Sequence, residues 1–265
     1  MLAYPEIDPV AFALGPVTVH WYGLTYLGGL AFAWWLAVRQ TQRPGSVLKR
    51  EQVDDLIFYA AIGIVLGGRL GYAFFYGGER LAEDPAWLLR VWQGGMSFHG
   101  GLLGVIAAMW LFARRQGIAI GPLLDFIAPL APVGLALGRL GNFIGQELWG
   151  RASDVPWAMV FPRDPLQLAR HPSQLYQFAL EGVLLFVIVL VFSSRPRPTW
   201  ATAGLFAVGY GCLRFVAEFF REPDAHLGFQ ALGWVTRGQL LCLPMIAIGL
   251  YLMVFASRSK RTTAA

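Results

Sequence analysis

The chain has 265 residues, of which 56% are hydrophobic and only 14% are charged. An average soluble domain is about 25% charged, because a folded surface needs polar cover. This composition argues against a solvated enzyme, a disordered chain and a nucleic-acid-binding arm, so no nucleic-acid partner is expected. The net charge of +5 is typical of basic loops in a membrane protein. The expected fold class is an all-α, polytopic membrane protein.

Seven segments are long and apolar enough to cross a membrane, which takes about 20 residues. They cover residues 18–38, 55–76, 97–114, 121–144, 174–194, 200–220 and 238–257. The N-terminal sequence MLAYPEID lacks the basic start of a signal peptide, so the first segment is expected to stay in the protein as a span. No soluble domain or repeat interrupts the series, and residues 1–265 are predicted to form a single integral membrane domain.

The distribution of basic residues predicts the orientation. With the N-terminus outside, 11 of the 21 lysines and arginines lie in cytoplasmic segments, 7 lie in outer segments and 3 lie within spans. Membrane proteins carry an excess of lysine and arginine in their cytoplasmic loops. The N-terminus is therefore predicted outside and the C-terminus in the cytoplasm.

Polar residues within the spans are predicted to gather in one layer. At a rise of about 1.5 Å per residue, Arg69 and Arg214 lie about 21 Å, and Arg139 about 27 Å, above the cytoplasmic starts of their spans. The residues expected in the outer half of the bilayer are Tyr22, Arg69, His99, Arg139, Asn142, Glu181, Arg214 and Glu218. Charged groups at this depth are costly and mark function by default. The three arginines predict an anion site, and a phospholipid phosphate is the abundant anion there.

Simpler explanations of these residues remain open. Arg214 and Glu218 are spaced i,i+4 and could neutralise each other. Arg69 could snorkel or brace a neighbouring helix, and Glu181 could bond Gln177 or a backbone group. Asp125, at the start of a predicted span, is expected to be a helix-end residue.

Two glycine-rich segments, 94–104 and 138–150, flank several of the polar residues. Glycine allows helices, or a backbone and a ligand, to approach closely. Because histidine, arginine and asparagine are embedded in these segments, both are predicted to line the site.

Several motifs occur together in the order that one family has. They are Trp21-Tyr22-Gly23, Gly67–Tyr72, Phe98–Gly101, Arg139–Gly150, His171–Tyr176, and Arg214 with Glu218–Arg221. Over essentially its whole length the chain resembles the bacterial prolipoprotein diacylglyceryl transferase family. Gly145 is a departure, because the family usually has asparagine there, and this puts in doubt any family role at that position.

The resemblance implies transfer of the diacylglyceryl group of phosphatidylglycerol to the lipobox cysteine thiol of a preprolipoprotein. A thioether forms and glycerol 1-phosphate leaves, in the first step of bacterial lipoprotein maturation. The resemblance also implies seven transmembrane helices in the cytoplasmic (inner) membrane, with the active site toward the outer, periplasmic leaflet. The implied partners are phosphatidylglycerol, lipobox peptides and membrane lipid, and neither a metal nor an organic cofactor is expected.

This chemistry suggests a role for each candidate residue. Arg139 and Arg214 are expected to hold the phosphate as its charge develops, and Asn142 to bond a phosphate or glycerol oxygen. His99 is the candidate base for a thiol with a reference pKa near 8.5, or alternatively a positioning residue. The other predicted substrate-binding residues are Tyr22, Glu147, Gly150, Glu218 and Arg69. Tyr22 is expected to contact lipid or substrate, and Glu147 to orient the substrate or Arg151. Glu218 is expected to position Arg214, and Gly150 to act through the shape of its backbone.

The main alternative is a transporter of an anionic solute, which would also need polar residues within its spans. Against it, the ionisable residues gather on the outer side, and no internal repeat of the transporter type is visible. A structural or assembly protein of the membrane would not need His99 and two arginines in one layer. An intramembrane protease is poorly supported, since no Gly-x-Ser-x-Gly motif, zinc motif or aspartate pair occurs.

Overall fold

A computed structural model gives the structure of residues 2–15, 17–223 and 228–262, without the side chains of Val17 and of residues 258–262. The predicted cytoplasmic cations Arg258, Lys260 and Arg261 thus lie outside the described side chains. The chain divides into two compact units, one formed by Met1–Leu36 with Leu124–Ala265 and the other by Ala37–Leu123. A single domain over residues 1–265 stays a prediction.

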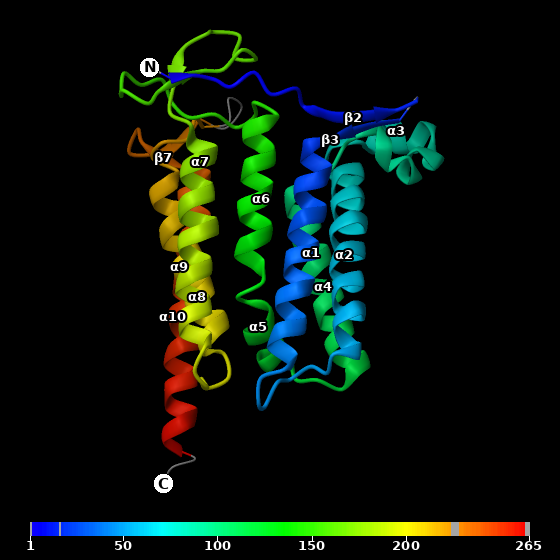
Figure 1. The fold of residues 1–265 in the computed structure, drawn as a ribbon, viewed down its shortest axis with the longest axis vertical. Coiled ribbons are helices and arrows are strands. Elements are labelled where there is room, and N and C mark those ends of the chain that lie inside the picture. Colours follow the sequence, from blue (N-terminus) through cyan, green and yellow to red (C-terminus); the bar gives the residue numbers. More distant parts are fainter. Residues whose placement is uncertain (1, 16, 224–227, 263–265) are drawn as a thin grey trace. The chain divides into compact units, whose positions relative to one another are not determined.

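The smaller unit is a pair of antiparallel helices joined by a short helical connection (Figure 1). These helices are α2 (Glu51–Tyr76) and α4 (Phe98–Gln116), and the connection holds α3 (Gly78–Glu83), η1 (Pro85–Leu89) and η2 (Val91–Gln93). A Cβ atom on Gly63 would lie 2.7 Å from the carbonyl oxygen of Gly104, and one on Gly71 would lie 2.6 Å from the Cα of Gly100. Only glycine permits this approach. The expectation that the glycines of 94–104 line a site is therefore corrected for Gly100 and Gly104, which pack two helices together.

The larger unit begins with short strands followed by α1 (Trp21–Thr41), which extends into the smaller unit's residues. The strands are β1 (Leu2–Ala3), β2 (Val10–Leu14) and β3 (Val17–His20). β2 and β3 form an antiparallel hairpin, and β1 pairs in parallel with β4 (Met159–Val160), which pairs with the antiparallel β5 (Ala169–Arg170). The N-terminal strand therefore joins the long connection 145–172.

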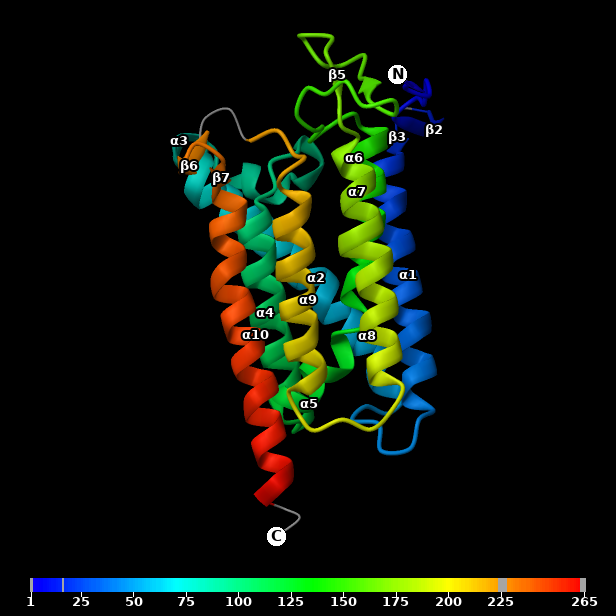
Figure 2. The ribbon, with the colours of Figure 1, turned by 90° about the vertical axis from the view of Figure 1, so that its left-hand side faces the viewer.

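The rest of this unit is built from helices. They are α5 (Ile120–Ile127), α6 (Ala131–Ile144), α7 (Ser173–Gln177), the π-helix η3 (Phe178–Leu184), α8 (Leu185–Ser193), α9 (Ala201–Ala217) and α10 (Arg237–Thr262), with β6 (Phe229–Ala231) and β7 (Val235–Thr236) before α10. α9 and α10 lie side by side along their length (Figures 1 and 2). α6 packs against α7 and η3, which in turn contact α9. These packed helices carry the residues discussed below.

Helices occupy all seven of the predicted span ranges in the part of the chain that is described. Three of them are long and apolar enough to cross a membrane: Glu51–Tyr76, Ser173–Ser193 and Arg237–Ser257. A fourth is obtained if α5 and α6, which meet at a bend of 45°, count as one broken span. The protein is thus mostly helical, with apolar helices typical of a membrane protein, whereas the number of seven spans and the orientation stay predictions.

Asp125 was predicted to be a helix-end residue of its own span, but it caps another helix. It lies within α5, and its carboxylate accepts hydrogen bonds from the backbone N–H groups of Trp200 (2.6 Å) and Ala203 (2.7 Å) at the start of α9. A carboxylate at this place satisfies otherwise unpaired N–H groups and complements the helix dipole. Asp125 therefore fixes the beginning of α9, the helix that carries Arg214.

Candidate functional site

Five charged side chains of alternating sign form a continuous series, here called the ion-pair chain: Arg139, Glu181, Arg214, Glu218 and Arg221. Glu181 accepts from Arg139 (Nη2–Oε2, 3.4 Å) and from Arg214 (Nη1–Oε1, 3.1 Å). Glu218 lies 2.6 Å from Nη2 of Arg214 and 3.2 Å from Nη1 of Arg221. The side chains of both glutamates are at most 1% exposed, and those of the three arginines are 12–18% exposed.

Close packing between α6 and η3 brings the first two members of the chain together. A Cβ atom on Gly182 would lie 2.5 Å from the Cβ of Ala136, so glycine is needed where the two helices meet. Glu181 precedes that glycine, and Arg139 follows Ala136 by about one turn of α6. The wide turn of a π-helix is an uncommon feature that is frequent at functional sites. The local fold thus places a buried carboxylate against an arginine of the neighbouring helix.

Each of the two glutamates of the ion-pair chain is paired with two arginines. A buried charge is costly unless it is paired. Arg139 stands at one end, with Glu181 as its ion-pair partner among the described residues, at the longest distance in the chain. It is also the most exposed member, at 18%. Arg139 is therefore the arginine of the ion-pair chain that is best placed to bind an anion.

Asn142 and Tyr22 lie close to Arg139. Asn142 follows Arg139 by three residues on α6 and is buried. Between them, a Cβ atom on Gly141 would lie 3.0 Å from Cδ2 of Tyr22 and 2.8 Å from Oγ1 of Thr25. α1 therefore contacts this turn of α6, and Tyr22 lies at the contact. The sequence-based grouping of Tyr22, Arg139 and Asn142 is consistent with this geometry.

Gly150 lies where three segments cross. Its N–H donates to the carbonyl oxygen of His171 (2.9 Å), and the next N–H, that of Arg151, donates to the carbonyl oxygen of Phe220 (3.0 Å). A Cβ atom on Gly150 would lie 2.5 Å from each of these two oxygens. A larger residue cannot fit without moving a backbone, which supports the predicted role through backbone shape.

The backbone at Glu147 is attached to the start of α7. The amide Nε2 of Gln174 donates to the carbonyl oxygen of Glu147 (2.6 Å), and Ser173 Oγ donates to that of Leu148 (2.9 Å). Arg151, the alternative partner predicted for Glu147, donates instead from Nε to the carbonyl oxygen of Arg221 (3.0 Å). The connection 145–151 is thus tied both to α7 and to the end of the ion-pair chain.

A buried ion pair orders the rest of this connection. Asp164 lies 2.6 Å from Nε of Arg170, and both side chains are at most 6% exposed. The Asp164 carboxylate also accepts from the backbone N–H groups of Leu166 and Leu168. The hydrogen-bonded guanidinium of Arg170 holds the pKa of Asp164 below its ordinary value.

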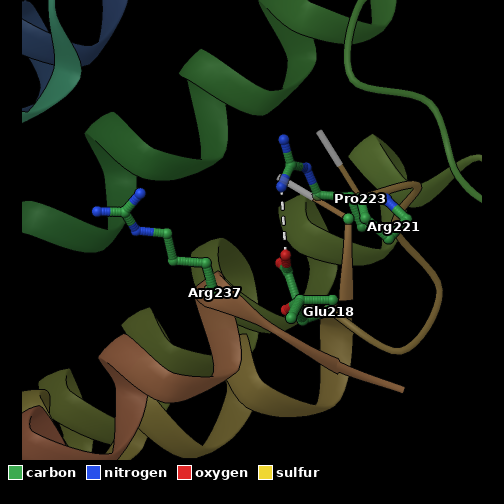
Figure 3. A pocket seen from close by; sticks show the side chains of 7 residues that line it. Glu218, Arg221, Pro223 and Arg237 are labelled. Carbon is green, nitrogen blue, oxygen red and sulfur yellow. Dashed lines mark hydrogen bonds and ion pairs between the residues drawn. The ribbon is translucent and has the colours of Figure 1, made fainter. Parts of the chain in front are cut away.

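A small pocket lies at the far end of the ion-pair chain. It is lined by Glu218, Arg221, Pro223, Gly228, Thr236, Arg237 and Gly238. In Figure 3 the carboxylate of Glu218 points to the guanidinium of Arg221, whereas that of Arg237 points away from this pair. The two carboxylate oxygens of Glu218 are therefore shared between Arg214 and Arg221. Glu218 can position Arg214, as predicted, only as part of the ion-pair chain.

Arg69 has a different role from the predicted substrate contact. Its guanidinium, in the smaller unit, is 2% exposed and lies 4.2 Å from the ring centre of Trp87. Nε, Nη1 and Nη2 donate to five backbone carbonyl oxygens: those of Leu88, Gly94, Gly95, Trp87 and Arg90. A guanidinium has five N–H donors, so all of them are used. The alternative explanation is favoured, because Arg69 braces the connection between α2 and α4.

His99 also belongs to the smaller unit. It is the second residue of α4, whose first turn is capped by Ser97, and its side chain is exposed. Its imidazole packs edge-on against the ring of Phe98, with 5.6 Å between the ring centres. An exposed imidazole can exchange protons, so a role as base or as positioning residue stays a prediction.

Sequence reasoning underestimated Glu181 and missed Arg221. Glu181 was placed in the polar layer with a bond to Gln177 or to a backbone group left open, but it joins two arginines from α6 and α9. The only signal was its depth, which matched that of Arg139 and Arg214. Arg221 was counted as a loop cation, although its spacing of i,i+3 from Glu218 was visible.

Known proteins match the chain over nearly its whole length. The family model described as prolipoprotein diacylglyceryl transferase matches residues 9–255. A relative from Azotobacter vinelandii is 60% identical over 260 residues, and one from Ectopseudomonas mendocina is 59% identical over 260 residues, each alignment covering 98% of both chains. A relative from Pseudomonas aeruginosa is 57% identical over 258 residues, with 97% of both chains covered. All three are named phosphatidylglycerol–prolipoprotein diacylglyceryl transferase.

Proposed function

Because the chain belongs to the prolipoprotein diacylglyceryl transferase family, we propose that it transfers the diacylglyceryl group of phosphatidylglycerol to the lipobox cysteine of preprolipoproteins. The observation that carries this proposal is the near-complete match to relatives named for that activity. The ion-pair chain, with the partly exposed Arg139 at one end, supports it. A transporter of an anionic solute is not favoured by these relatives.

The reaction replaces a carbon–oxygen bond by a carbon–sulfur bond. The cysteine sulfur attacks the glycerol carbon that carries the phosphate ester, and the electron pair of the broken bond stays on the leaving glycerol 1-phosphate. Negative charge on that phosphate is stabilised by Arg139 and Arg214, which Glu181 and Glu218 hold in place. Fixed donors of this kind contribute about 3–4 kcal/mol each in well-studied enzymes. Asn142 and Tyr22 are placed to complete the headgroup site.

The thiol proton needs an acceptor, and we assign that role to His99. A free thiol has a pKa near 8.5 and is mostly protonated at neutral pH, whereas a neutral imidazole can accept its proton. Gly150 and Glu147 shape the connection beside the site. No cofactor takes part in this scheme.

The family also leads us to propose seven spans with the N-terminus outside. The helices in each of the seven predicted ranges support this number, and the excess of basic residues in the predicted cytoplasmic loops supports the orientation. In that arrangement the protein is a multi-pass protein of the bacterial inner membrane, with Arg139 and Arg214 toward the outer leaflet.

Purified protein incubated with phosphatidylglycerol and a lipobox peptide tests the proposal. Mass spectrometry should detect the diacylglyceryl adduct, and a coupled assay should detect glycerol phosphate. Arg139→Ala should lower the rate about 10²–10³-fold. Arg50→Ala, at an exposed arginine paired with Asp54, is the control and should keep the full rate. A folded wild-type protein that forms no adduct would refute the proposed function.

A further inference from the structure

Two glutamines of α7 are completely buried, although each has an amide atom without a hydrogen-bond partner among the described residues. Gln174 and Gln177 are both 0% exposed. Within the described residues, neither Nε2 nor Oε1 of Gln177 has a hydrogen-bond partner, and Oε1 of Gln174 has none. Nε2 of Gln174 donates to the carbonyl oxygen of Glu147. Gln174 therefore has a structural task, whereas the amide of Gln177 has none among the residues that the structure describes.

A buried amide without partners is costly. Leaving a buried polar group unpaired costs about 1–3 kcal/mol, and most such groups in folded proteins are paired. A leucine of similar size would avoid this cost. The amide of Gln177 is therefore expected to bind something that is not part of the chain, either water or a ligand.

The position of Gln177 indicates which ligand. Gln174, Gln177 and Glu181 follow at intervals of three and four residues, and all three are fully buried, so they share the inner side of their helix. α7 packs against α6 and α9, the helices that carry Arg139 and Arg214. Glu181 binds both of these arginines. Gln177 therefore lies about one helical turn, or ~6 Å along the axis, from Glu181, the carboxylate that binds both arginines of the proposed phosphate site.

We propose that Gln177 binds the free hydroxyl groups of the glycerol headgroup while Arg139 and Arg214 hold its phosphate. This inference rests on the proposed function. An amide offers two donors and an acceptor, which matches two neighbouring hydroxyls that each donate and accept. Gln177 is thus a specificity-determining residue, because a phospholipid whose headgroup lacks hydroxyls leaves the amide unpaired. Sites built to bond a substrate hydroxyl discriminate strongly against analogues without it.

The test compares two lipids with the same acyl chains. One is phosphatidylglycerol and the other carries an n-propyl headgroup, which keeps the phosphate and lacks both hydroxyls. Binding of each lipid to the purified protein is measured by native mass spectrometry, and kcat and KM of transfer are measured separately. Gln177→Leu should weaken phosphatidylglycerol binding and raise its KM about tenfold or more. Binding of the propyl lipid should be unchanged or stronger, so the preference between the two lipids falls.

Gln40→Leu is the matched control. Gln40 is also a buried glutamine whose Nε2 lacks a partner among the described atoms, but it lies on α1, toward the opposite end from Tyr22. Its replacement should leave the lipid preference unchanged. Gln177→Met serves as a second variant if Gln177→Leu fails to fold.

Two results would separate this inference from the proposed function. If Gln177→Leu and Gln177→Met keep the wild-type preference in binding and transfer, the amide binds only water and the inference is wrong. If wild-type protein forms no adduct but prefers phosphatidylglycerol in binding, and Gln177→Leu loses that preference, the proposed reaction fails while the headgroup contact stands.

Discussion

Replacing Glu181 by glutamine tests whether the ion-pair chain holds the arginines in place. The carboxylate lies 3.4 Å from Arg139 and 3.1 Å from Arg214. At an effective dielectric constant of about 20, each contact is worth ~5 kcal/mol before desolvation is counted. Removing one partner of a buried pair costs about 3–5 kcal/mol in measured cases. Glu181→Gln should therefore lower the free energy of unfolding by about that amount.

The loss should be visible in thermal unfolding of the purified protein in lipid nanodiscs without anionic lipid. For a chain of this size each kcal/mol shifts Tm by roughly 2–4 °C, so a decrease of about 10 °C is expected. The substitution also removes the negative charge that pairs with Arg139 and Arg214. Phosphatidylglycerol should therefore raise the Tm of the variant more than that of the wild type, because the lipid supplies the missing negative charge.

The matched control is Glu83→Gln, at an exposed glutamate that ends α3. Its Tm and its transfer rate should equal those of the wild type. The reasoning is refuted if Glu181→Gln unfolds at the wild-type temperature and transfers at the wild-type rate. It is also refuted if phosphatidylglycerol stabilises both proteins equally, since the arginines would then not depend on Glu181 for neutralisation.

Three further predictions concern the surroundings of the site. Gly150→Ala should lower transfer at least tenfold with a smaller change in Tm, because the methyl group meets the carbonyl oxygens of His171 and Phe220 at 2.5 Å; kcat, KM and Tm measured together check this. Because Arg170 lowers the pKa of Asp164 from 3.8, the ion pair contributes its full stability above about pH 4 and loses it as the pH falls further. Proteolysis of residues 145–172 should therefore accelerate below about pH 4 in the wild type. The proteolysis rate of Asp164→Asn should depend less on pH. Arg69→Lys should lower Tm, because a lysine cannot supply five donors to the carbonyl groups of the connection. It should leave KM for phosphatidylglycerol unchanged, and a raised KM would instead indicate that Arg69 contacts the substrate.

The positions of the helices could be predicted because apolar length is a local property of the sequence. Each predicted range contains a helix, and the break between α5 and α6 falls inside a range that was predicted as one continuous span. Hydropathy does not show that break, but Pro129 lies between the end of α5 at Ile127 and the start of α6 at Ala131, and a proline opposes a continuous helix there. The depth of Arg139 and Arg214 follows from residue counting and stays a prediction, whereas their common partner Glu181 shows that the two arginines lie close together.

The partners of the charged residues were not predictable, because they depend on which helices touch. Glu181 faces two helices that are distant in sequence, and Asp125 caps a helix that begins 75 residues later. Arg69 looked like another phosphate ligand because the sequence does not reveal that its loop turns five carbonyl groups toward it. Depth in the membrane thus identifies charged residues of interest, while tertiary contacts decide between binding a ligand and bracing a loop.

The π-helix η3 has a consequence for the tolerance of this protein to changes in chain length. A wide turn holds more residues than a regular α-helical turn, so deleting one residue within Phe178–Leu184 could leave an unbroken helix. Each residue of a π-helix turns the chain by less than the roughly 100° of an α-helix, so the seven residues of η3 turn it about as far as six α-helical residues would. After the deletion, Leu185 and Val189, which pack in the apolar core with Ala128, would therefore still face that core while Gln177 kept its place. A one-residue deletion should thus be tolerated better within η3 than within the regular helix α9, where it turns the following residues by about 100°.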